Sequence, residues 1–595
     1  MIKKSFPLFV IFLTVFFCYH GILNSEFIGD DWYRLNELRA YFNDGFLNVI
    51  SNAMPDRPLL TALLFLNYSY GKMDPFSFKL TSLTLHSILC FLLFRFFVHF
   101  QKNYLGNIHH RLALLITLIF ATHTVHTQAL ISSVQVSVII SGIGIVGSLL
   151  FYSKYLLEKK RNYLLVSLLF FLIGLLSKPN IITLPLMLMI LLKTTNNFSL
   201  KKIKTIVPFF ILCLIPFAFN YFGKINIQEG SLDSFHYLLV QLRVIFYYFK
   251  LFLIPVNLHF YYDLNQNYDF YSWKTWLAFI GHFGILVSSY VYSKKIPYVG
   301  LAVAFVYLAL VPESSIFPID HIIFEHRTYV PYLFISFMML IFLTHLQKSN
   351  HKRFVEIILT VFILIYLSLT LRRIQSVDTF EKWCIDDYQK RENSLNADLT
   401  LLQNLYLVAG NRGSISPAGQ AIVSTLVTKK SKSVLHEAMI GMLSYNTDIK
   451  QKKIITLEKI ANILLQDQVP MTFTQRSNFI TFLEIHLFKM LNDKILYAQK
   501  IEPILQSQAL VFLAFPRFHI LHQKKYLQVL LVLKNYYENK LSHAQLTNDD
   551  FKHYCATLKQ LILILPDKKT ELLNKVGLLE KKYPQMSKLI LDFKN

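Results

Sequence analysis

The feature that most constrains this chain is a succession of apolar runs separated by short, often basic loops. Apolar residues make up 54% of the 595 residues and charged residues only 16%, a balance typical of proteins with many membrane-spanning segments. We therefore predict an all-α fold, a polytopic membrane helical bundle of about eleven spans. The predicted spans are residues 6–23, 78–100, 112–122, 129–152, 163–180, 181–192, 206–222, 276–292, 298–311, 329–346 and 354–371.

The basic residues of the loops set the predicted orientation of these spans. Lys3 and Lys4 precede the first run and are expected to hold the N-terminus in the cytoplasm. The run 236–255 is assigned to an interfacial or re-entrant helix, because counting it as a span would place Lys294 and Lys295 outside. This topology places the long loop 24–77, and everything after residue 371, on the extracytoplasmic side.

The chain is predicted to have two domains, a membrane domain over residues 1–371 and a soluble, all-helical domain over residues 372–595. Apolar residues recur at helical spacing in the second domain, as at Leu457, Ile460 and Leu464. A degenerate solenoid of paired helices is consistent with this spacing, although no repeat period is readable. The five cysteines show neither a disulfide framework nor a metal-ligand spacing.

A net charge of +24 raises the question of a nucleic-acid partner. The basic residues sit mainly in short loops and in the Lys-rich last third, where positive-inside topology and contact with anionic membrane lipids explain them. We therefore expect membrane lipids, and no nucleic acid, as partners. The Lys, Phe and Ile content and the lack of a eukaryotic targeting signal favour a bacterial inner membrane.

An acidic pair, Asp30–Asp31, follows the first predicted span within a few residues. Carboxylates so close to hydrocarbon are costly unless they hold a cation or take part in proton transfer. The simpler alternative is an interfacial turn with two solvated acids. The predicted topology favours function, because it collects further polar residues on the same side: Asp56, Arg57, His86, His123, His126, Lys178, Arg243, Asp320, Glu325, His326 and Arg327.

Each of these residues also has a structural explanation. Arg57 and Lys178 can be interfacial cations whose stems lie along apolar surface, and His86 can be a core histidine of an apolar helix. The His123-Thr-Val-His126 sequence is a weak metal signal, and the Glu325–Arg327 sequence fits a salt-bridged helix cap. Their joint placement favours an enzyme that acts on a membrane-embedded phosphate-bearing donor, since such an enzyme needs both carboxylates and cations.

Several segments resemble a known family in order and placement. They are Phe27-Ile-Gly-Asp-Asp31, Arg57-Pro-Leu59, His86, His123-Thr-Val-His126, Ser177-Lys-Pro179 and Glu325-His-Arg-Thr-Tyr-Val-Pro331. This set resembles the polytopic GT-C glycosyltransferases, most closely the branch of TMTC-type O-mannosyltransferases and related bacterial protein O-glycosyltransferases. The resemblance covers roughly residues 5–371. A helical-repeat domain often follows the membrane part in that branch, and the region after Arg372 matches it in position.

The resemblance implies inverting transfer of a sugar from a polyprenyl-phosphate-linked donor to an extracytoplasmic acceptor. Asp31 by preference, or Asp30, would be the general base, and the pair could also hold a divalent cation such as Mg²⁺ or Mn²⁺. Arg57, Lys178 and Arg327 would neutralise the departing phosphate. The other polar residues of the substrate site would position donor or acceptor: His86, His123, His126, Arg243, Glu325 and His326.

The acceptor and the reaction class stay open at this point. A protein Ser/Thr hydroxyl of a pilin or another secreted protein is the preferred acceptor, and a lipid A phosphate or a glycan are alternatives. A nucleotide-sugar donor is disfavoured because no Gly-rich phosphate loop is present. Three other classes remain: a lipid-linked saccharide polymerase or ligase, a transporter or flippase of such saccharides, and a non-catalytic scaffold of the envelope.

Overall fold

The computed structural model describes residues 2–216, 233–260, 262, 272–319, 322–346, 352–390, 401, 405 and 416–428. The described part is all-helical, as predicted, and the chain divides into two units, Met1–Arg391 and Glu392–Asn595. The helices that extend from the N-terminus to the first buried hairpin are α1 (Ile2–Tyr19), η1 (His20–Asn24), α2 (Asp30–Tyr41), η2 (Phe42–Asp44), α3 (Phe46–Asn52), α4 (Pro58–Gly71), α5 (Pro75–Phe100), η3 (Gln101–Leu105), α6 (His110–Ala121), η4 (Thr124–His126), α7 (Thr127–Ile131), α8 (Val136–Glu158) and α9 (Arg161–Ser177).

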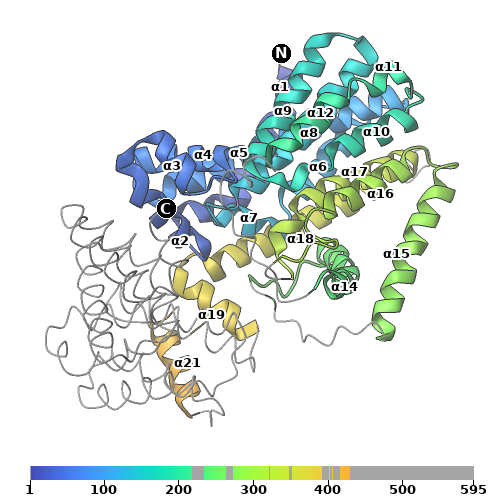
Figure 1. The fold of residues 1–595 in the computed structure, drawn as a ribbon. Helices are drawn as coiled ribbons and strands as arrows, with labels where there is room; N and C mark the ends of the chain where they lie inside the picture. The colour runs from blue at the N-terminus through green and yellow to red at the C-terminus, as the bar shows by residue number, and fades with distance from the viewer. Residues whose placement is uncertain are drawn as a thin grey trace, which may run out of the picture. The chain divides into compact units, whose positions relative to one another are not determined.

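The second half of the first unit continues this arrangement (Figure 1). Its helices are η5 (Pro179–Ile181), α10 (Leu184–Thr194), α11 (Leu200–Ile203), α12 (Val207–Leu212), α14 (Ser234–Leu253), α15 (Trp273–Tyr292), α16 (Val299–Leu310), η6 (Glu325–Thr328), α17 (Tyr329–Leu346), α18 (Lys352–Val377) and α19 (Phe380–Lys390). In the second unit the described helix is α21 (Pro417–Thr428), so the predicted solenoid lies outside the described residues.

Six helices of the described part are long and apolar enough to cross a membrane, which fits an integral membrane protein. They are the segments Phe6–Asn24, Pro75–Leu105, Val136–Glu158, Trp273–Tyr292, Glu325–Leu346 and Lys352–Val377. A seventh arises if α6 and the helix Thr124–Ile131, which meet at a 46° bend, are counted as one broken span. The predicted count of about eleven is therefore not confirmed.

The difference comes mainly from apolar helices that are shorter than the bilayer requires. Arg161–Ser177, Pro179–Thr194 and Val299–Leu310 are apolar but have fewer than 18 residues. The break between α9 and α10 at Pro179 was predicted, since proline interrupts a helix. The predicted span 206–222 extends beyond the described residues, because residues 217–232 are not among them.

The expected domain boundary at residues 371/372 falls inside α18, and the first unit continues to Arg391. Two contacts attach the following helix, α19, to the loop after α14. Asp387 accepts a hydrogen bond from the amide of Phe260 at 3.2 Å, and Lys390 donates to the carbonyl of Leu258 at 2.8 Å. The helix that follows the last span is therefore part of the membrane unit.

The helices α2, α3 and α4 lie together beside the start of α5 (Figure 1). The segment before α2 is tied to the end of α18, because Glu26 donates its amide to the carbonyl of Asp378 at 2.8 Å and accepts from the amide of Phe380 at 2.9 Å. The segment just before the acidic pair thus meets the turn between α18 and α19.

The opposite ends of the spanning helices form a second polar layer, which we call the far end. There Gln101 donates to Thr344 at 3.0 Å, and the hydroxyl of Ser153 lies 3.0 Å from the His99 Nε2 and 2.9 Å from the Tyr104 hydroxyl. The C-terminal parts of α5, α8 and α17 therefore lie at the same level, and the acidic pair and the far end are at opposite ends of the bundle.

Close packing of α8 on α9 places the C-terminus of α9 in the protein interior. A side chain at Gly144 would meet the Gly174 Cα and the Phe170 carbonyl oxygen, each at 2.8 Å from its Cβ. Ser177 donates to the backbone carbonyl of Ser137 at 3.3 Å and joins the ends of the two helices. Small residues at helix crossings are a common way to pack spans in a membrane.

We predict that Gly144→Ala lowers the stability of the protein, because the added methyl group meets backbone that cannot move aside. Overpacking of this kind costs about 1–3 kcal/mol. The measurement is the midpoint of thermal unfolding in detergent. Gly284→Ala is the matched control, since a Cβ there meets nothing within 4 Å. Equal midpoints for both variants would contradict the described helix crossing.

Candidate active site

Asp31 is fully buried and its carboxylate is held by the loop between α7 and α8. It accepts hydrogen bonds from the Ser132 hydroxyl at 2.9 Å and from the amides of Ser133 and Val134 at 3.0 and 3.1 Å. The Lys79 ammonium lies 3.6 Å from the same carboxylate. Both carboxylate oxygens are thus engaged in structural contacts, which disfavours Asp31 as the general base and reverses the preference drawn from the sequence.

Lys79, in the second turn of α5, was not singled out from the sequence. It is fully buried, donates to the carbonyl oxygen of Ile131 and lies 5.5 Å from the centre of the Phe27 ring. A lysine in an apolar helix can be recognised as unusual, but its partners come from residues far away in the sequence. Residues 129–135 were predicted to begin a long span. They instead contain the end of α7 and a polar loop, whose residues bind Lys79 and Asp31.

Asp30 differs from Asp31 in its surroundings. It is exposed, and it begins α2 directly after Gly29, whose φ of +52° few other residues adopt. The protein around the carboxyl group removes part of its water and raises the pKa of Asp30. The charge of Arg34 opposes this rise, Asp31 adds to it, and Arg57 opposes it more weakly. Asp30 is therefore the exposed member of the pair, in contrast to the buried Asp31.

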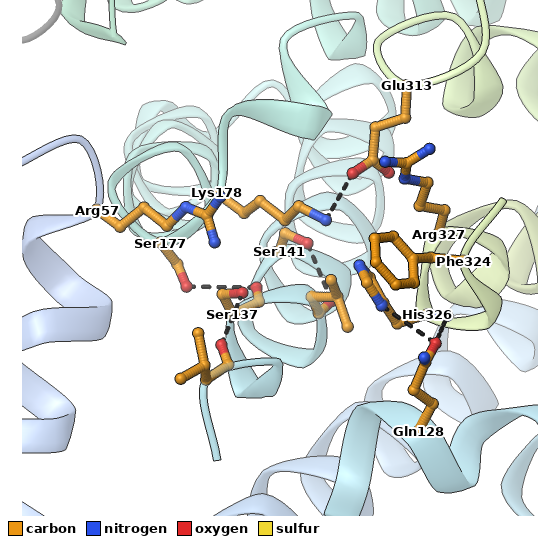
Figure 2. A network of polar contacts seen from close by, with 12 residues as sticks. Arg57, Gln128, Ser137, Ser141, Ser177, Lys178, Glu313, Phe324, His326 and Arg327 are labelled. Atoms are coloured by element: carbon orange, nitrogen blue, oxygen red, sulfur yellow. Dashed lines mark hydrogen bonds and ion pairs between the residues drawn. The ribbon is translucent and has the colours of Figure 1, made fainter. Parts of the chain in front are cut away.

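Three cations from three separate segments lie close enough to interact electrostatically, and one of them, Arg57, also acts on Asp30. We call Arg57, Lys178 and Arg327 the cation cluster. Figure 2 shows Arg57 and Lys178 extending from two segments toward the Glu313 carboxylate, with Arg327 beyond it. Lys178 is buried and its ammonium lies 2.6 Å from a Glu313 oxygen. Its charge interacts with those of Arg57 and Arg327.

Local structure gives each cation its position. Arg57 caps α4 just before Pro58, and its Nε forms a 3.2 Å ion pair with Asp56, so its two terminal nitrogens can still bind a ligand. Lys178 follows α9 at the break before Pro179. Arg327 lies in η6, where its guanidinium donates to the Ile322 carbonyl at 3.3 Å and covers the Phe324 ring.

His326 is held beside the cation cluster by Gln128, a residue not recognised from the sequence. The amide and the Nδ1 of His326 both contact the Gln128 amide oxygen, at 2.7 and 3.1 Å (Figure 2). Because that oxygen only accepts hydrogen bonds, the proton lies on Nδ1. The Nε2 atom is then a lone-pair acceptor for a substrate hydroxyl.

Glu325 points away from this cluster toward α18 and α19. It is buried, accepts a hydrogen bond from the Tyr262 hydroxyl at 2.8 Å, and lies in the electrostatic field of Arg373 and Lys390. Its second oxygen has no hydrogen-bond partner among the described residues. Glu325 and His326 are neighbours in η6 but have partners in different parts of the protein, Tyr262 and Gln128. The structure does not bring Glu325 into contact with Asp30.

The three histidines His86, His123 and His126 are buried among aromatic rings in the interior of the bundle. His86 hydrogen-bonds the Tyr329 hydroxyl and lies 3.1 Å from the Ala121 carbonyl, and the His123 ring contacts the Phe252 carbonyl at 3.0 Å. These contacts join α5, α6, α14 and α17, so His86 and His123 have the structural role that the sequence left open. The ring nitrogens of His126 have no hydrogen-bond partner among the described residues.

Arg243 lies half-buried on α14, and Asp320 lies outside the described residues. The predicted divalent cation has no joint site at the acidic pair, because the carboxylate of Asp31 is already occupied by hydrogen-bond donors and Lys79. Within the described ranges no group of three or more His, Cys, Asp and Glu side chains is arranged to hold a metal ion. The cation stays a prediction from the resemblance, and no step of the chemistry below depends on it.

Comparisons with protein-family models, with curated proteins and with solved structures find no match to this chain. The resemblance to the GT-C glycosyltransferases therefore stays a prediction from the quoted sequence segments.

We predict that Asp31→Asn destabilises the protein strongly, because it leaves the buried Lys79 ammonium without its counter-charge. Breaking a buried pair by removal of one partner costs about 3–5 kcal/mol. The measurement is the thermal unfolding midpoint of the purified protein. Asp30→Asn is the matched variant and is expected to unfold near the wild-type midpoint, while Lys79→Met in the Asp31→Asn background should recover part of the loss. An Asp31→Asn midpoint like that of wild type would contradict the structural role.

Proposed function

We propose that this protein is a membrane glycosyltransferase that transfers a sugar from a polyprenyl-phosphate-linked donor to an extracytoplasmic acceptor. The observation that supports this most is the convergence of the cation cluster from three distant segments, with its member Arg57 in the electrostatic field of the exposed Asp30 carboxylate. The cluster holds three cations against the carboxylates of Asp56 and Glu313, and a bound phosphate would offset the remaining positive charge. The resemblance of the sequence to GT-C glycosyltransferases supports the same reaction.

In this proposal the donor phosphate binds between Arg57, Lys178 and Arg327. The terminal nitrogens of Arg57 offer paired donors that match phosphate oxygens, and Lys178 would turn from Glu313 toward the ligand. Their charges stabilise the phosphate most when the bond to the sugar breaks and negative charge develops on the leaving oxygen. The polyprenyl chain would lie in the membrane beside the bundle.

Asp30 accepts the proton of the acceptor hydroxyl as that oxygen attacks the anomeric carbon. The new bond joins the acceptor oxygen to this carbon, the bond to the phosphate oxygen breaks, and polyprenyl phosphate or diphosphate leaves with the bonding electrons. Attack from the face opposite the phosphate inverts the anomeric centre. The Nε2 of His326 is placed to accept a hydrogen bond from a sugar or acceptor hydroxyl.

The orientation follows the distribution of basic residues. Lys154, Lys159 and Arg161 lie where α8 ends and α9 begins, at the far end, and the positive-inside rule assigns that end to the cytoplasm. Asp30 and the cation cluster then face the periplasm of a bacterial inner membrane, the side on which the sequence also predicts residues 372–595. The acceptor we favour is a Ser/Thr hydroxyl of a secreted protein such as a pilin.

The transfer is tested by the intact masses of envelope proteins and glycolipids in cells with wild-type protein, with no protein and with Asp30→Asn. We expect one species to lose a discrete sugar mass without the protein, and Asp30→Asn to lower transfer by about 10²–10⁴-fold, since general base catalysis contributes this much. The species that loses the mass identifies the acceptor.

Asp44→Asn is the matched control, because Asp44 is exposed in the same loop. Each variant must reach the membrane in the wild-type amount. Unchanged masses in cells without the protein would exclude the transferase, and a wild-type pattern for Asp30→Asn would exclude the assigned base. Lys178→Gln separates this chemistry from scaffolding, since a transferase should lose its activity while the level of the protein in the membrane stays normal.

The pH dependence of transfer should report the raised pKa of Asp30. The base must be deprotonated to act, so kcat/KM should fall as the pH drops through the pKa of Asp30, which burial raises from its ordinary value. Arg34→Gln removes a charge that lowers this pKa, and the acidic limb of the profile should move to higher pH. Arg39→Gln, an exposed change further along α2, should leave the profile in place. A shift to lower pH in Arg34→Gln would contradict the assignment.

A further inference from the structure

A groove between α6 and α18 lies at the far end of the bundle, away from the candidate active site. It has a volume of about 540 Å³ and is lined mostly by apolar surface of Leu114, Leu115, Ile357 and Val361. Its mouth carries Arg111 and Arg353, each the second residue of its helix. The amide of His109, just before α6, donates to the Gln101 side chain at 3.2 Å. Because Gln101 belongs to the far end, the start of α6 and the mouth of the groove lie at that level.

The groove has the polarity gradient of a phospholipid. On α18 the lining residues are Arg353, Glu356, Ile357, Thr360 and Val361, whose spacing gives one face of the helix. The face extends about 12 Å, from charged residues at the start of the helix to apolar residues two turns further on. Ile357 and Val361 are 60% and 47% exposed in the isolated chain, so this face can contact lipid.

The charges at the mouth are the more specific observation. Arg111 and Arg353 are exposed, and no ion pair of the described residues joins either one to Glu356. One oxygen of Glu356 is buried and has no hydrogen-bond partner in the described part of the chain. A carboxylate at the edge of the hydrocarbon region without a donor is costly. Two cations beside one unsatisfied carboxylate fit a ligand that carries both a phosphate and an amine.

We propose that this groove binds a zwitterionic aminophospholipid of the phosphatidylethanolamine type. Its phosphate contacts the guanidinium groups of Arg111 and Arg353, which also lie at the positive N-terminal ends of α6 and α18. Its primary ammonium donates to Glu356, and its acyl chains follow the apolar residues of the groove. An anionic lipid without an amine would meet the repulsion of Glu356, and a choline headgroup would offer it no N–H donor.

The test is native mass spectrometry of the full chain in mild detergent with phosphatidylethanolamine, phosphatidylcholine or phosphatidylglycerol of the same acyl chains. We expect wild type to retain phosphatidylethanolamine about tenfold better than the other two, the difference expected for one charge-assisted hydrogen bond. Arg111→Gln with Arg353→Gln should abolish this retention. Glu356→Gln should remove the preference and raise retention of phosphatidylglycerol.

Arg161→Gln is the matched control, because Arg161 is an exposed arginine that begins α9 at the far end but does not line the groove. It should retain phosphatidylethanolamine like wild type. Equal retention of the three lipids by wild type, undiminished retention by the double arginine variant, or an unchanged preference in Glu356→Gln would each overturn the proposal. The proposal does not depend on glycosyl transfer, and the same preparation can be used whether or not that activity is found.

Discussion

The contact of Asp31 with Lys79 and the loop after α7 is the interaction on which the described arrangement depends most. It joins the segment after the first span, the start of α5 and the approach to α8 through one buried carboxylate. A buried carboxylate that accepts several hydrogen bonds and faces an ammonium can remain in a membrane protein, whereas either charge alone would be costly. The two acids therefore differ in their surroundings: Asp31 is buried and holds three segments together, and Asp30 is exposed.

The close crossing of α8 and α9 is the second packing contact that positions the residues of the candidate site. The approach of Gly144 to Gly174 brings the end of α9 against the start of α8, and the proline after Lys178 stops the helix there. Lys178 can then reach Glu313, from the loop after α16, and lie near Arg57. The cation cluster is thus a consequence of helix packing, because none of its members is close to another in the sequence.

The sequence predicts an all-helical membrane protein because apolar runs and proline breaks are local features. It also predicts that Asp30, Arg57, Lys178, His326 and Arg327 share one side, since loop charges fix the parity of the spans. The sequence does not predict that Asp31 is buried and Asp30 exposed. That difference comes from contacts of Asp31 with residues 79 and 132–134, which only folding brings together. The buried roles of His86 and His123 depend in the same way on backbone carbonyls of distant helices. The count of about eleven spans is not confirmed, because apolar composition does not reveal where a helix ends.

The most direct test of the division between the two acids is chemical labelling of carboxylates in the purified protein. A water-soluble carbodiimide with an amine nucleophile, followed by peptide mass spectrometry, reports the labelling of Asp30 and Asp31 separately. The account predicts that Asp30 is modified, that sugar transfer is lost at the same rate, and that Asp31 stays unmodified while the protein is folded. Modification of Asp31 as fast as that of Asp30, or transfer that persists after Asp30 is modified, would contradict it.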